Sequence, residues 1–563
     1  MTEIIMKRDM SIVGNKEYDL IIIGGGIFGI CAAWDATLRG LTVALLERRD
    51  FAHAASANCF KIVHGGIRYL QHADLYRIRE SSQERRALLR IAPHLVQPLP
   101  IVIPTYGHGM QSKMILTVGL LTYDLLTLDR NRGIEDPQRS IPRGRIISRQ
   151  ECLKMFPGLK KVGLSGAAVF YDGQMYNTAQ LALSFLKSAV KAGADAMNYT
   201  EVTDFIQKRD RIFGVIAQDL INGNKVEIRG KVVLNAAGPW APLLLKQQMN
   251  IHLDPEPVFS RDTCFIVSRR LIGDYALAVQ GKTEDPDALL SRGKRHLFIV
   301  PWHDSTLIGV WHVVYKGSPD KFTVTKKELQ AFLDEINEAY PTLGLTLKDV
   351  AEWNAGLVLF GNNKEGTINL SYGKRSVIID HAKYNHMEGL ITLIGVRYTT
   401  ARGVASKAID LVFKKLGKKA PASETAGTPI YGGRIAHFEK FLGQAIIENQ
   451  SKLSSDVVRA LVHNYGSEYH EVLRYINEDP RWAETIGTSN VIKAEVLYAV
   501  REGMAQKLVD VVFRRTDLGT ERYPRESELR ICADIMAKEF GWAEWQIQRE
   551  IAEVKETFPG YIH

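Results

Sequence analysis

Short apolar runs alternate with segments of helical spacing through residues 18–416 of this chain. Residues 20–23 and 42–46 are apolar runs of the length expected for buried strands, and residues 30–39 between them are compatible with a helix. Helical spacing returns at 178–192 and 399–416, and further strand-like runs occur at 231–235, 376–380 and 390–394. This repeated switching predicts an α/β fold with a mainly parallel sheet.

Other patterns predict a second sheet and a helical region. Residues 297–315 alternate apolar and polar side chains in two blocks separated by Asp304 and Ser305, as antiparallel strands would. Asn222-Gly223 is typical of a hairpin turn. A linker rich in Pro, Ala, Gly, Ser and Thr spans 419–433, and apolar residues then recur at helical spacing in 438–447, 495–512 and 526–540. We expect a discontinuous domain over residues 1–425, with insertions at about 80–175 and 255–350, and a helical cap domain over 434–563.

A glycine-rich turn directly follows the first predicted strand. Gly24, Gly26 and Gly29 form the pattern G-x-G-x-x-G. The first glycine allows a tight turn, the second lets backbone N–H groups approach a pyrophosphate, and the third lets the helix pack close to the sheet. Glu47, at the end of the second strand, can accept hydrogen bonds from an adenosine ribose. The alternative is a merely structural turn, but the strands and the acidic residue at the expected spacing predict dinucleotide binding.

The composition is that of a globular protein of 563 residues, with 45% hydrophobic and 24% charged residues. Its length suggests roughly two or three domains. No run of about twenty apolar residues would span a membrane, and residues 1–18 lack the apolar core and cleavage site of a signal peptide. The five cysteines have no metal-type or redox-type spacing, which is typical of buried thiols in a reducing compartment: Cys31, Cys59, Cys152, Cys264 and Cys532.

The net charge of +9 indicates either an anionic partner or an unfocused excess of surface Lys and Arg. No nucleic-acid motif accompanies the basic run 414–419, so we expect no nucleic-acid partner. Residues 114–128 are strongly apolar, too short to span a bilayer, and lie between Lys113 and the cations Arg130 and Arg132. They predict a helix in the plane of a membrane interface, although a helix buried in the core would give nearly the same pattern.

Several motifs in collinear order resemble those of one family. Residues 61–70, Lys-Ile-Val-His-Gly-Gly-Ile-Arg-Tyr-Leu, are similar to its signature S-K-L-I-H-G-G-L-R-Y-L, and residues 235–240 to N-A-T-G-P-W. Residues 298–302 with 315–319, 395–402 and 514–519 resemble F-V-I-P-W…Y-K-G-D-P, G-G-K-L-T-T-Y-R and R-R-T-x-L-G. The family is that of the FAD-dependent, aerobic, quinone-linked glycerol-3-phosphate dehydrogenases. The resemblance implies a Rossmann-like FAD-binding domain of the glutathione-reductase and amino-acid-oxidase type, an inserted antiparallel-sheet substrate domain and a C-terminal all-α domain.

The resemblance also implies which residues hold FAD. Ser56 and Lys61 match positions around its phosphates and ring, and Val202 matches a position that contacts the adenine. The turn from Gly395 would lie against the pyrimidine side of the ring, where a helix N-terminus stabilises the charge of the reduced flavin; the alternative is an ordinary helix start capped by Thr399. The cofactor-binding candidates are Gly24, Gly25, Gly26, Ile27, Phe28, Gly29, Glu47, Arg48, Ser56, Lys61, His64, Gly65, Gly66, Val202, Ala237, Gly238, Gly395, Arg397, Tyr398, Thr399 and Thr400.

The implied reaction is the oxidation of a secondary alcohol, in which a base removes the hydroxyl proton while hydride leaves the same carbon for flavin N5. His64 is the favoured base because an imidazole titrates near neutrality; the alternative is a histidine that hydrogen-bonds the flavin without exchanging a proton. Arg68 and Arg397 are candidates for orienting an anionic substrate and stabilising a developing alkoxide, although Arg68 could equally be a surface ion-pair residue. No metal is expected.

The chain departs from the family at substrate positions. Two arginines of the family, one of which helps bind the substrate phosphate, correspond to Val358 and Leu370. The family's K-G-S-H becomes Arg-Asp-Thr-Cys at 261–264, its G-T-T-D becomes Gly-Val-Trp-His at 309–312, and its S-K-L becomes Phe-Lys-Ile at 60–62. A phosphate would rely on other cations, for which the candidates are Arg68, Arg397, Arg261 and Lys364.

Three functions fit these observations. The first is oxidation of glycerol 3-phosphate to dihydroxyacetone phosphate with electrons passed to quinone; the second is the same chemistry on another polyol, polyol phosphate or hydroxy acid. The third is a flavin-binding protein without catalysis. The replaced arginines favour poor turnover of glycerol 3-phosphate. We expect a small hydroxy substrate, a quinone acceptor and a cytoplasmic protein that can attach to the inner membrane surface; a homodimer is left open.

Overall fold

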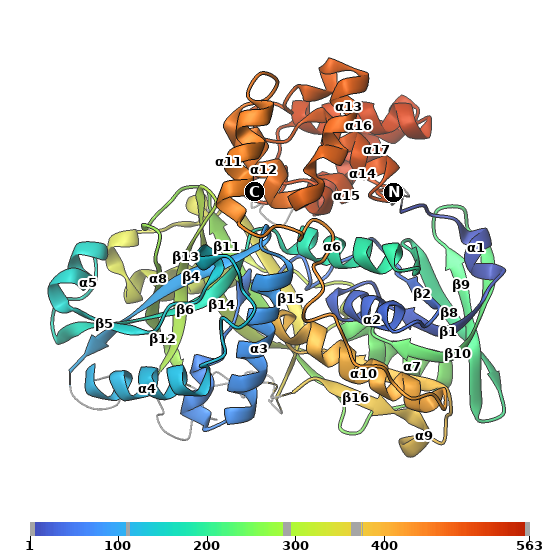
Figure 1. Cartoon of the computed structure of the whole chain (residues 1–563), viewed down its shortest axis with the longest axis horizontal. Coiled ribbons are helices and arrows are strands. Elements are labelled where there is room, and N and C mark those ends of the chain that lie inside the picture. Colours follow the sequence, from blue (N-terminus) through green and yellow to red (C-terminus); the bar gives the residue numbers. More distant parts are fainter. Residues whose placement is uncertain (1–5, 108–112, 285–293, 362–372, 374, 558–563) are drawn as a thin grey trace.

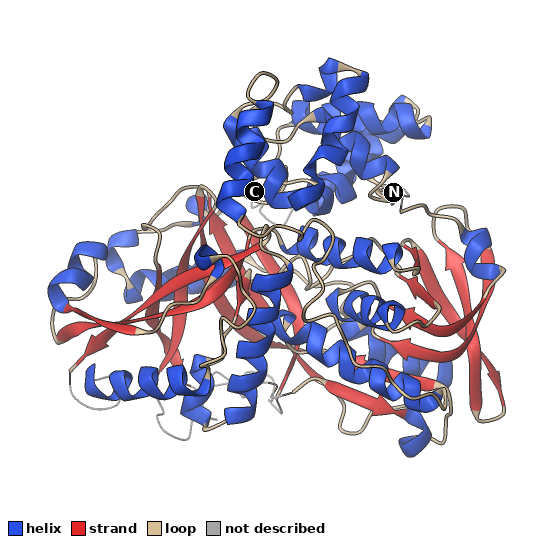
Figure 2. Cartoon of the chain, in the orientation of Figure 1, coloured by secondary structure: helices blue, strands red, loops and turns tan. Residues whose placement is uncertain are grey.

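The computed structural model describes residues 6–107, 113–284, 294–361, 373 and 375–557, which form two sheets and a C-terminal group of helices (Figure 1, Figure 2). In the view of Figure 1 the two sheets lie side by side and the C-terminal helices lie above them. The predicted α/β class and the all-α C-terminal region are confirmed. The exact domain boundaries given above stay a prediction.

The first sheet has eight strands, of which the central ones are parallel. Its main order is β16 (Val377–Asp380), β17 (Leu390–Ile394), β10 (Lys225–Asn235), β1 (Glu17–Ile23), β2 (Val43–Leu46) and β7 (Asp195–Met197). β8 (Thr200–Lys208) and β9 (Arg211–Asp219) extend it as an antiparallel ribbon, joined to β10 through the predicted turn at Gly223. Strands covered on both faces account for the continuous apolar runs in the sequence.

The second sheet has nine strands and is mainly antiparallel. Its order is β15 (Glu352–Phe360), β11 (Val258–Val267), β14 (Ser305–Tyr315), β13 (Lys294–Trp302), β12 (Ala276–Glu284), β4 (Val96–Tyr106), β6 (Leu164–Met175) and β3 (Ile62–Val63), with β5 (Arg145–Ser148) beside β6. The two predicted blocks over 297–315 are the antiparallel pair β13 and β14. We call the part formed by β11, β14 and β15 the roof sheet.

Helices cover both sheets. Around the sheets they are α1 (Met10–Gly14), α2 (Ile27–Leu38), α3 (Leu75–Ile91), α4 (Lys113–Leu126), α5 (Arg149–Met155), α6 (Thr178–Lys191), α7 (Ala241–Met249), α8 (Lys326–Ala339), α9 (His381–Tyr384) and α10 (Ala401–Lys415). α2 is buried between α6 and α10, and the Trp34 ring meets Phe185 edge to face at 5.3 Å. The apolar spacing of α2, α6 and α10 therefore serves one shared core, whereas α5 and α8 pack into a separate core.

The C-terminal helices are α11 (Phe438–Asn449), α12 (Ser455–Tyr465), α13 (Tyr469–Glu478), α14 (Lys493–Arg501), α15 (Leu508–Asp510), α16 (Glu526–Phe540) and α17 (Glu544–Thr557). The helical spacing over 495–512 does not correspond to one continuous helix, because α14 ends at Arg501 and α15 begins at Leu508. Met504 then adopts a left-handed φ of 57°, and the carbonyl of Gly503 accepts a hydrogen bond from Arg515 Nε at 2.8 Å instead of continuing the helix. An apolar period alone did not reveal this break.

α4 has two different faces. Leu120 and Tyr123 are buried against the sheets, whereas Met114, Val118, Leu121 and Leu125 are between 59% and 74% exposed. Arg130, counted among the flanking cations in the sequence, is buried and bonds the carbonyl of Ile141 and the carboxylate of Asp124. α4 is thus not fully buried in the core, and Arg130 is not an accessible cation beside it. Within the described part of the chain, no helix is long and apolar enough to cross a membrane.

Candidate cofactor and active site

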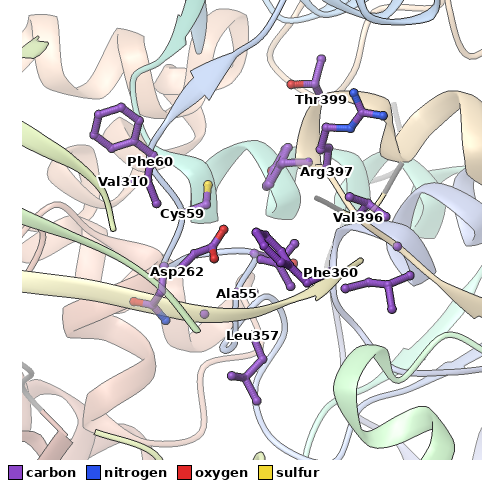
Figure 3. A pocket seen from close by; sticks show the side chains of 18 of the residues that line it. Ala55, Cys59, Phe60, Asp262, Val310, Leu357, Phe360, Val396, Arg397 and Thr399 are labelled. Atoms are coloured by element: carbon purple, nitrogen blue, oxygen red, sulfur yellow. The ribbon is translucent and has the colours of Figure 1, made fainter. Parts of the chain in front are cut away.

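A cavity of about 930 Å³ lies between the two sheets (Figure 3). At one end it is lined by Glu47, Val202 and Trp240 from the first sheet and its loops. At the other end it is lined by His64 and Arg397, and residues of the roof sheet form part of its wall. Residues far apart in the sequence therefore meet around one cavity of the size of a cofactor site.

The first glycine turn has the backbone that a dinucleotide needs. Gly24 has a left-handed φ of 106°, and an added Cβ at Gly29 would lie 2.0 Å from the carbonyl oxygen of Gly24. At Gly26, by contrast, an added Cβ would meet only Ser56 Oγ, at 3.3 Å, because this position faces the cavity. Ser56 Oγ accepts a hydrogen bond from the Ile27 N–H at the start of α2. The turn thus leaves a cradle at the positive end of α2, which fits the pyrophosphate of FAD.

The end expected for adenosine contains an oriented carboxylate. Glu47 Oε2 accepts a hydrogen bond of 2.6 Å from the Gly25 N–H, and Oε1 accepts one of 2.8 Å from the Arg49 N–H. Burial raises the pKa of the Glu47 carboxyl. The Arg48 guanidinium lies 5.4 Å from the Trp240 ring centre and pairs with Asp320. The two backbone hydrogen bonds hold the Glu47 carboxylate at the cavity wall, where a ribose can donate to it.

His64 belongs to a buried network behind the opposite end of the cavity. Its Nδ1 lies 3.4 Å from Asp172 Oδ2, and its side chain is nearly half exposed. Asp172 Oδ1 accepts the Gly65 N–H at 2.6 Å and lies 3.2 Å from the fully buried Arg85 guanidinium. Burial alone would raise the pKa of Asp172, but His64, Arg85 and the Gly65 N–H outweigh it, and the pKa lies below its usual range. A carboxylate thus faces one side of the imidazole.

The second glycine turn is joined to the same histidine. Thr399 Oγ1 accepts a hydrogen bond of 3.1 Å from the His64 backbone N–H, so Thr399 does not cap the following helix with its side chain. The Arg397 guanidinium donates to the Tyr69 hydroxyl and stacks 5.0 Å from that ring centre. The Arg77 guanidinium lies on Tyr69 as well, at 4.4 Å. The segment 64–66 and the second glycine turn therefore form one wall of the cavity.

The predicted site residues divide into two groups. Most line the cavity: Gly24, Gly26, Ile27, Phe28, Glu47, Arg48, Ser56, Lys61, His64, Gly66, Arg68, Val202, Ala237, Gly238, Gly395, Arg397, Tyr398 and Thr399. Gly25, Gly29, Gly65 and Thr400 lie behind this wall and shape it. An added Cβ at Gly65, for example, would lie 2.0 Å from the Arg85 guanidinium.

Of the positions that differ from the family, Val358 lies on the cavity wall and Arg261 lies in an ion pair. Val358 lines the cavity beside Leu357 and Phe360, and Figure 3 shows this apolar end together with Val396. Arg261, considered as a substitute cation, instead pairs with Glu328 and donates to the Thr323 carbonyl. Leu370 and Lys364 lie outside the described residues.

Sequence reasoning missed several residues that the second sheet contributes. Lys294, Arg295 and His296 line the cavity from β13, and burial together with the charge of Arg68 lowers the pKa of His296 to about 4. Asp172 comes from β6, and no sequence motif marked it as a site residue. Asp262 and His312 were noted only as departures, although both line the cavity and lie 2.8 Å apart. The alternation of apolar and polar residues along these strands was visible in the sequence, but it did not show which face of each strand lines the cavity.

Comparison with known proteins agrees with this geometry. A family model described as FAD dependent oxidoreductase matches residues 19–379, and one described as the C-terminal domain of alpha-glycerophosphate oxidase matches residues 423–547. A glycerol-3-phosphate dehydrogenase of Synechocystis sp. is 32% identical over 98% of both chains. The aerobic glycerol-3-phosphate dehydrogenase of Staphylococcus haemolyticus is 29% identical over 89% of this chain and 87% of its own.

The X-ray structure of the glycerol-3-phosphate dehydrogenase from Bacillus halodurans, complexed with FAD, has a TM-score of 0.75 and 25% identity, covering 97% of this chain and 95% of that one. The fold and the cavity define an FAD-dependent oxidoreductase acting on CH–OH groups. Its cofactor is FAD. The chain belongs to the family of FAD-dependent glycerol-3-phosphate dehydrogenases.

Proposed function

We propose that this chain oxidises the secondary alcohol group of a small, unphosphorylated hydroxy compound. The observation that carries the proposal is the position of His64 on the cavity wall, with Asp172 beside its ring and Arg397 on the same wall. When bound, FAD supplies the hydride acceptor. The protein's part is then to orient the alcohol and to take its proton.

His64 is the proposed base. Asp172 lies within reach of Nδ1 and would hold the tautomer in which Nε2 carries the lone pair. Arg85 and the Gly65 N–H keep Asp172 ionised and fixed, which supports the imidazolium once it has formed. In this arrangement His64 accepts the hydroxyl proton and Asp172 positions it without being protonated.

Arg68 and Arg397 are proposed to stabilise the oxygen as its proton leaves. Both line the cavity, from the short helix Ile67–His72 and from the turn before Tyr398–Thr400. Arg397 is held against Tyr69, which restricts its orientation. A guanidinium held in place before the reaction stabilises developing negative charge without reorganising during it.

The absence of phosphate from the substrate is inferred from the walls of the cavity. The relatives are named for glycerol 3-phosphate, but this chain has Val358 in an apolar group and has Arg261 paired with Glu328. Each charge-assisted hydrogen bond that is lost would cost about 1.5–3 kcal/mol. Lys294 and Arg295 are cations on the β13 side, and they are the groups by which a phosphate could still be held.

Anaerobic bleaching of the flavin tests this proposal. Glycerol and other unphosphorylated secondary alcohols should reduce the bound flavin faster, at equal concentration, than glycerol 3-phosphate does. Val358→Arg should raise kcat/KM for glycerol 3-phosphate at least tenfold and leave that for glycerol unimproved. Efficient wild-type turnover of glycerol 3-phosphate, with no gain in Val358→Arg, would refute the substrate proposal.

We further propose that electrons pass to a membrane quinone from a peripherally attached protein on the cytoplasmic face of the inner membrane. α4 supports this, because Leu116, Gly119 and Leu120 line the cavity while the opposite side exposes Val118 and Leu121. An apolar side chain of this size that enters the acyl region contributes about 1.5–3 kcal/mol. A quinone dissolved in the membrane would then be one helix away from the flavin cavity.

Sedimentation with anionic vesicles tests membrane attachment. Val118→Asp combined with Leu121→Asp should reduce the bound fraction at least tenfold. The matched control is Ile447→Asp, because Ile447 is 60% exposed on α11 among the C-terminal helices, away from α4 (Figure 1). A wild-type protein that stays in the supernatant would exclude the attachment, and an equal loss in both variants would exclude α4 as its site.

A further inference from the structure

Asp262 is the carboxylate of the roof sheet that faces the cavity. It lies on β11, where its register partners are His312 on β14 and Gly356 on β15. Figure 3 shows its side chain directed into the cavity between Ala55 and Phe60. An added Cβ at Gly356 would lie 2.7 Å from Ala55 Cβ, so this glycine lets the roof approach the loop closely. The close approach places Asp262 on the wall of the cavity, next to the loop 53–61.

The two carboxylate oxygens of Asp262 have different roles. Oδ1 accepts a hydrogen bond of 2.7 Å from the fully buried Ser260 hydroxyl and lies 2.8 Å from His312 Nδ1. Among the described residues no hydrogen bond or ion pair reaches Oδ2, and the side chain remains 22% exposed to the cavity. One oxygen is therefore fixed by the protein, and the other is presented to a ligand.

The surroundings determine which ligand group this oxygen can accept. The nearby walls include Val358, Val310 and Phe360, so a ligand there has little water with which to hydrogen-bond. A hydroxyl group can donate to the carboxylate oxygen. A phosphate dianion has only acceptor oxygens and the same sign of charge, so it is repelled at this position.

The pair also explains two departures in the sequence. The resemblance places glycine at position 262 and aspartate at position 312, whereas this chain has Asp262 and His312. They are register partners on neighbouring strands, just before the irregularity between Thr263 and Cys264. The two changes thus produce a single structural unit, a carboxylate that is oriented by an imidazole.

We propose that Asp262, oriented by Ser260 and His312, is a specificity-determining residue that binds a hydroxyl group next to the alcohol being oxidised. The substrate class is an uncharged vicinal diol or polyol. This inference rests on the proposed function and specifies the substrate of the same site. Ser260 and His312 act through Asp262 as positioning residues.

Equilibrium binding to the holoenzyme with its flavin already reduced tests the proposal without turnover, because a reduced flavin cannot accept the hydride. The probes are glycerol, 2-propanol and glycerol 3-phosphate, each titrated anaerobically and followed by calorimetry. Wild type should bind glycerol at least tenfold more tightly than 2-propanol, which lacks the neighbouring hydroxyl. Asp262→Leu should remove that preference, and Asp262→Asn should weaken glycerol binding while strengthening glycerol 3-phosphate binding, because the negative charge is gone.

Controls separate the specific effect from a general one. Asp274→Asn removes the same charge from a side chain that is 94% exposed on the molecular surface, and it should change none of the three affinities. Ser260→Ala should weaken glycerol binding less than Asp262→Leu does. The flavin content and the unfolding midpoint of each variant identify variants that fail to fold. Asp262→Asn is the variant expected to fold most like wild type, because asparagine has nearly the same shape as aspartate.

The outcomes for this inference and for the proposed function are distinguishable. If alcohols bleach the wild-type flavin but Asp262→Asn and Asp262→Leu bind all three probes as wild type does, the inference is wrong and the function stands. If no alcohol bleaches the flavin, the proposed function fails, while the binding preference for glycerol still tests Asp262. Tighter binding of glycerol 3-phosphate than of glycerol by wild type would overturn the inference directly.

Discussion

Replacing Gly26 should separate cofactor binding from folding. Its backbone has φ −77° and ψ 174°, which any residue can adopt, and an added Cβ meets only Ser56 Oγ, at 3.3 Å. Gly26→Val should therefore change the free energy of unfolding of the apoprotein by about 1 kcal/mol or less. Its branches would instead occupy the cradle in which backbone N–H groups approach the pyrophosphate.

The size of the effect on FAD follows from the hydrogen bonds that are lost. Two charge-assisted bonds to phosphate, at about 1.5–3 kcal/mol each, amount to about 3–6 kcal/mol. This corresponds to a loss of affinity between roughly a hundredfold and ten-thousandfold. FAD titration of the apoprotein, followed by flavin fluorescence, measures the dissociation constant, and denaturant unfolding of the same sample measures stability.

Gly24→Val is the matched comparison. Gly24 has φ 106°, and an added Cβ would lie 2.7 Å from the Ala236 carbonyl oxygen, so this variant should lose the fold together with FAD. Gly26→Val should lose FAD alone. A Gly26→Val protein whose FAD dissociation constant stays within twofold of wild type would refute the assignment of the cradle.

Two further predictions concern the contact between the sheets and the C-terminal helices. Lys187 donates a hydrogen bond to the Tyr498 hydroxyl, and burial lowers its pKa to about 7. The unfolded chain keeps this proton up to a pH of about 10. The free energy of unfolding should therefore rise by about 2 kcal/mol between pH 7 and pH 9, measured relative to Lys187→Met. Lys191→Met, exposed on the same helix, should leave that slope of the unfolding free energy unchanged. Arg515→Met breaks a two-bond pair with buried Asp50 and should lower the unfolding free energy by about 3–5 kcal/mol. A loss below about 1 kcal/mol in denaturant titrations would contradict the stabilising role of that pair.

The parts of the fold that were predictable from sequence depend on short-range patterns. The turn at Gly24, the hairpin turn at Gly223 and the alternation along β13 and β14 are each encoded within a few neighbouring residues. The break after Arg501 depends instead on a distant partner, because the carbonyl of Gly503 is used by Arg515. A period of apolar residues carries no information about such a partner.

The roof of the cavity was the least predictable part of the site. The pairing of Asp262 with His312 depends on the register of two strands separated by about forty residues, with an irregularity after Thr263. Asp172 likewise reaches His64 only because β3 pairs with β6. In α4 the sequence predicted an apolar helix, but it could not show that Leu120 turns toward the cavity while Leu121 turns outward.

The residues of the motif over 514–519 have a structural role in this fold, although the motif was recognised through a family of enzymes. Arg514 and Arg515 both donate to Asp50, which is buried just after β2. Asp50 precedes the loop 53–61, most of which lines the cavity, and it follows Glu47 at the adenosine end. None of the described residues beyond 422 lines the cavity itself. The C-terminal helices therefore influence the site by fixing the loop between its two ends, so substitutions at Asp50 should change FAD retention together with stability.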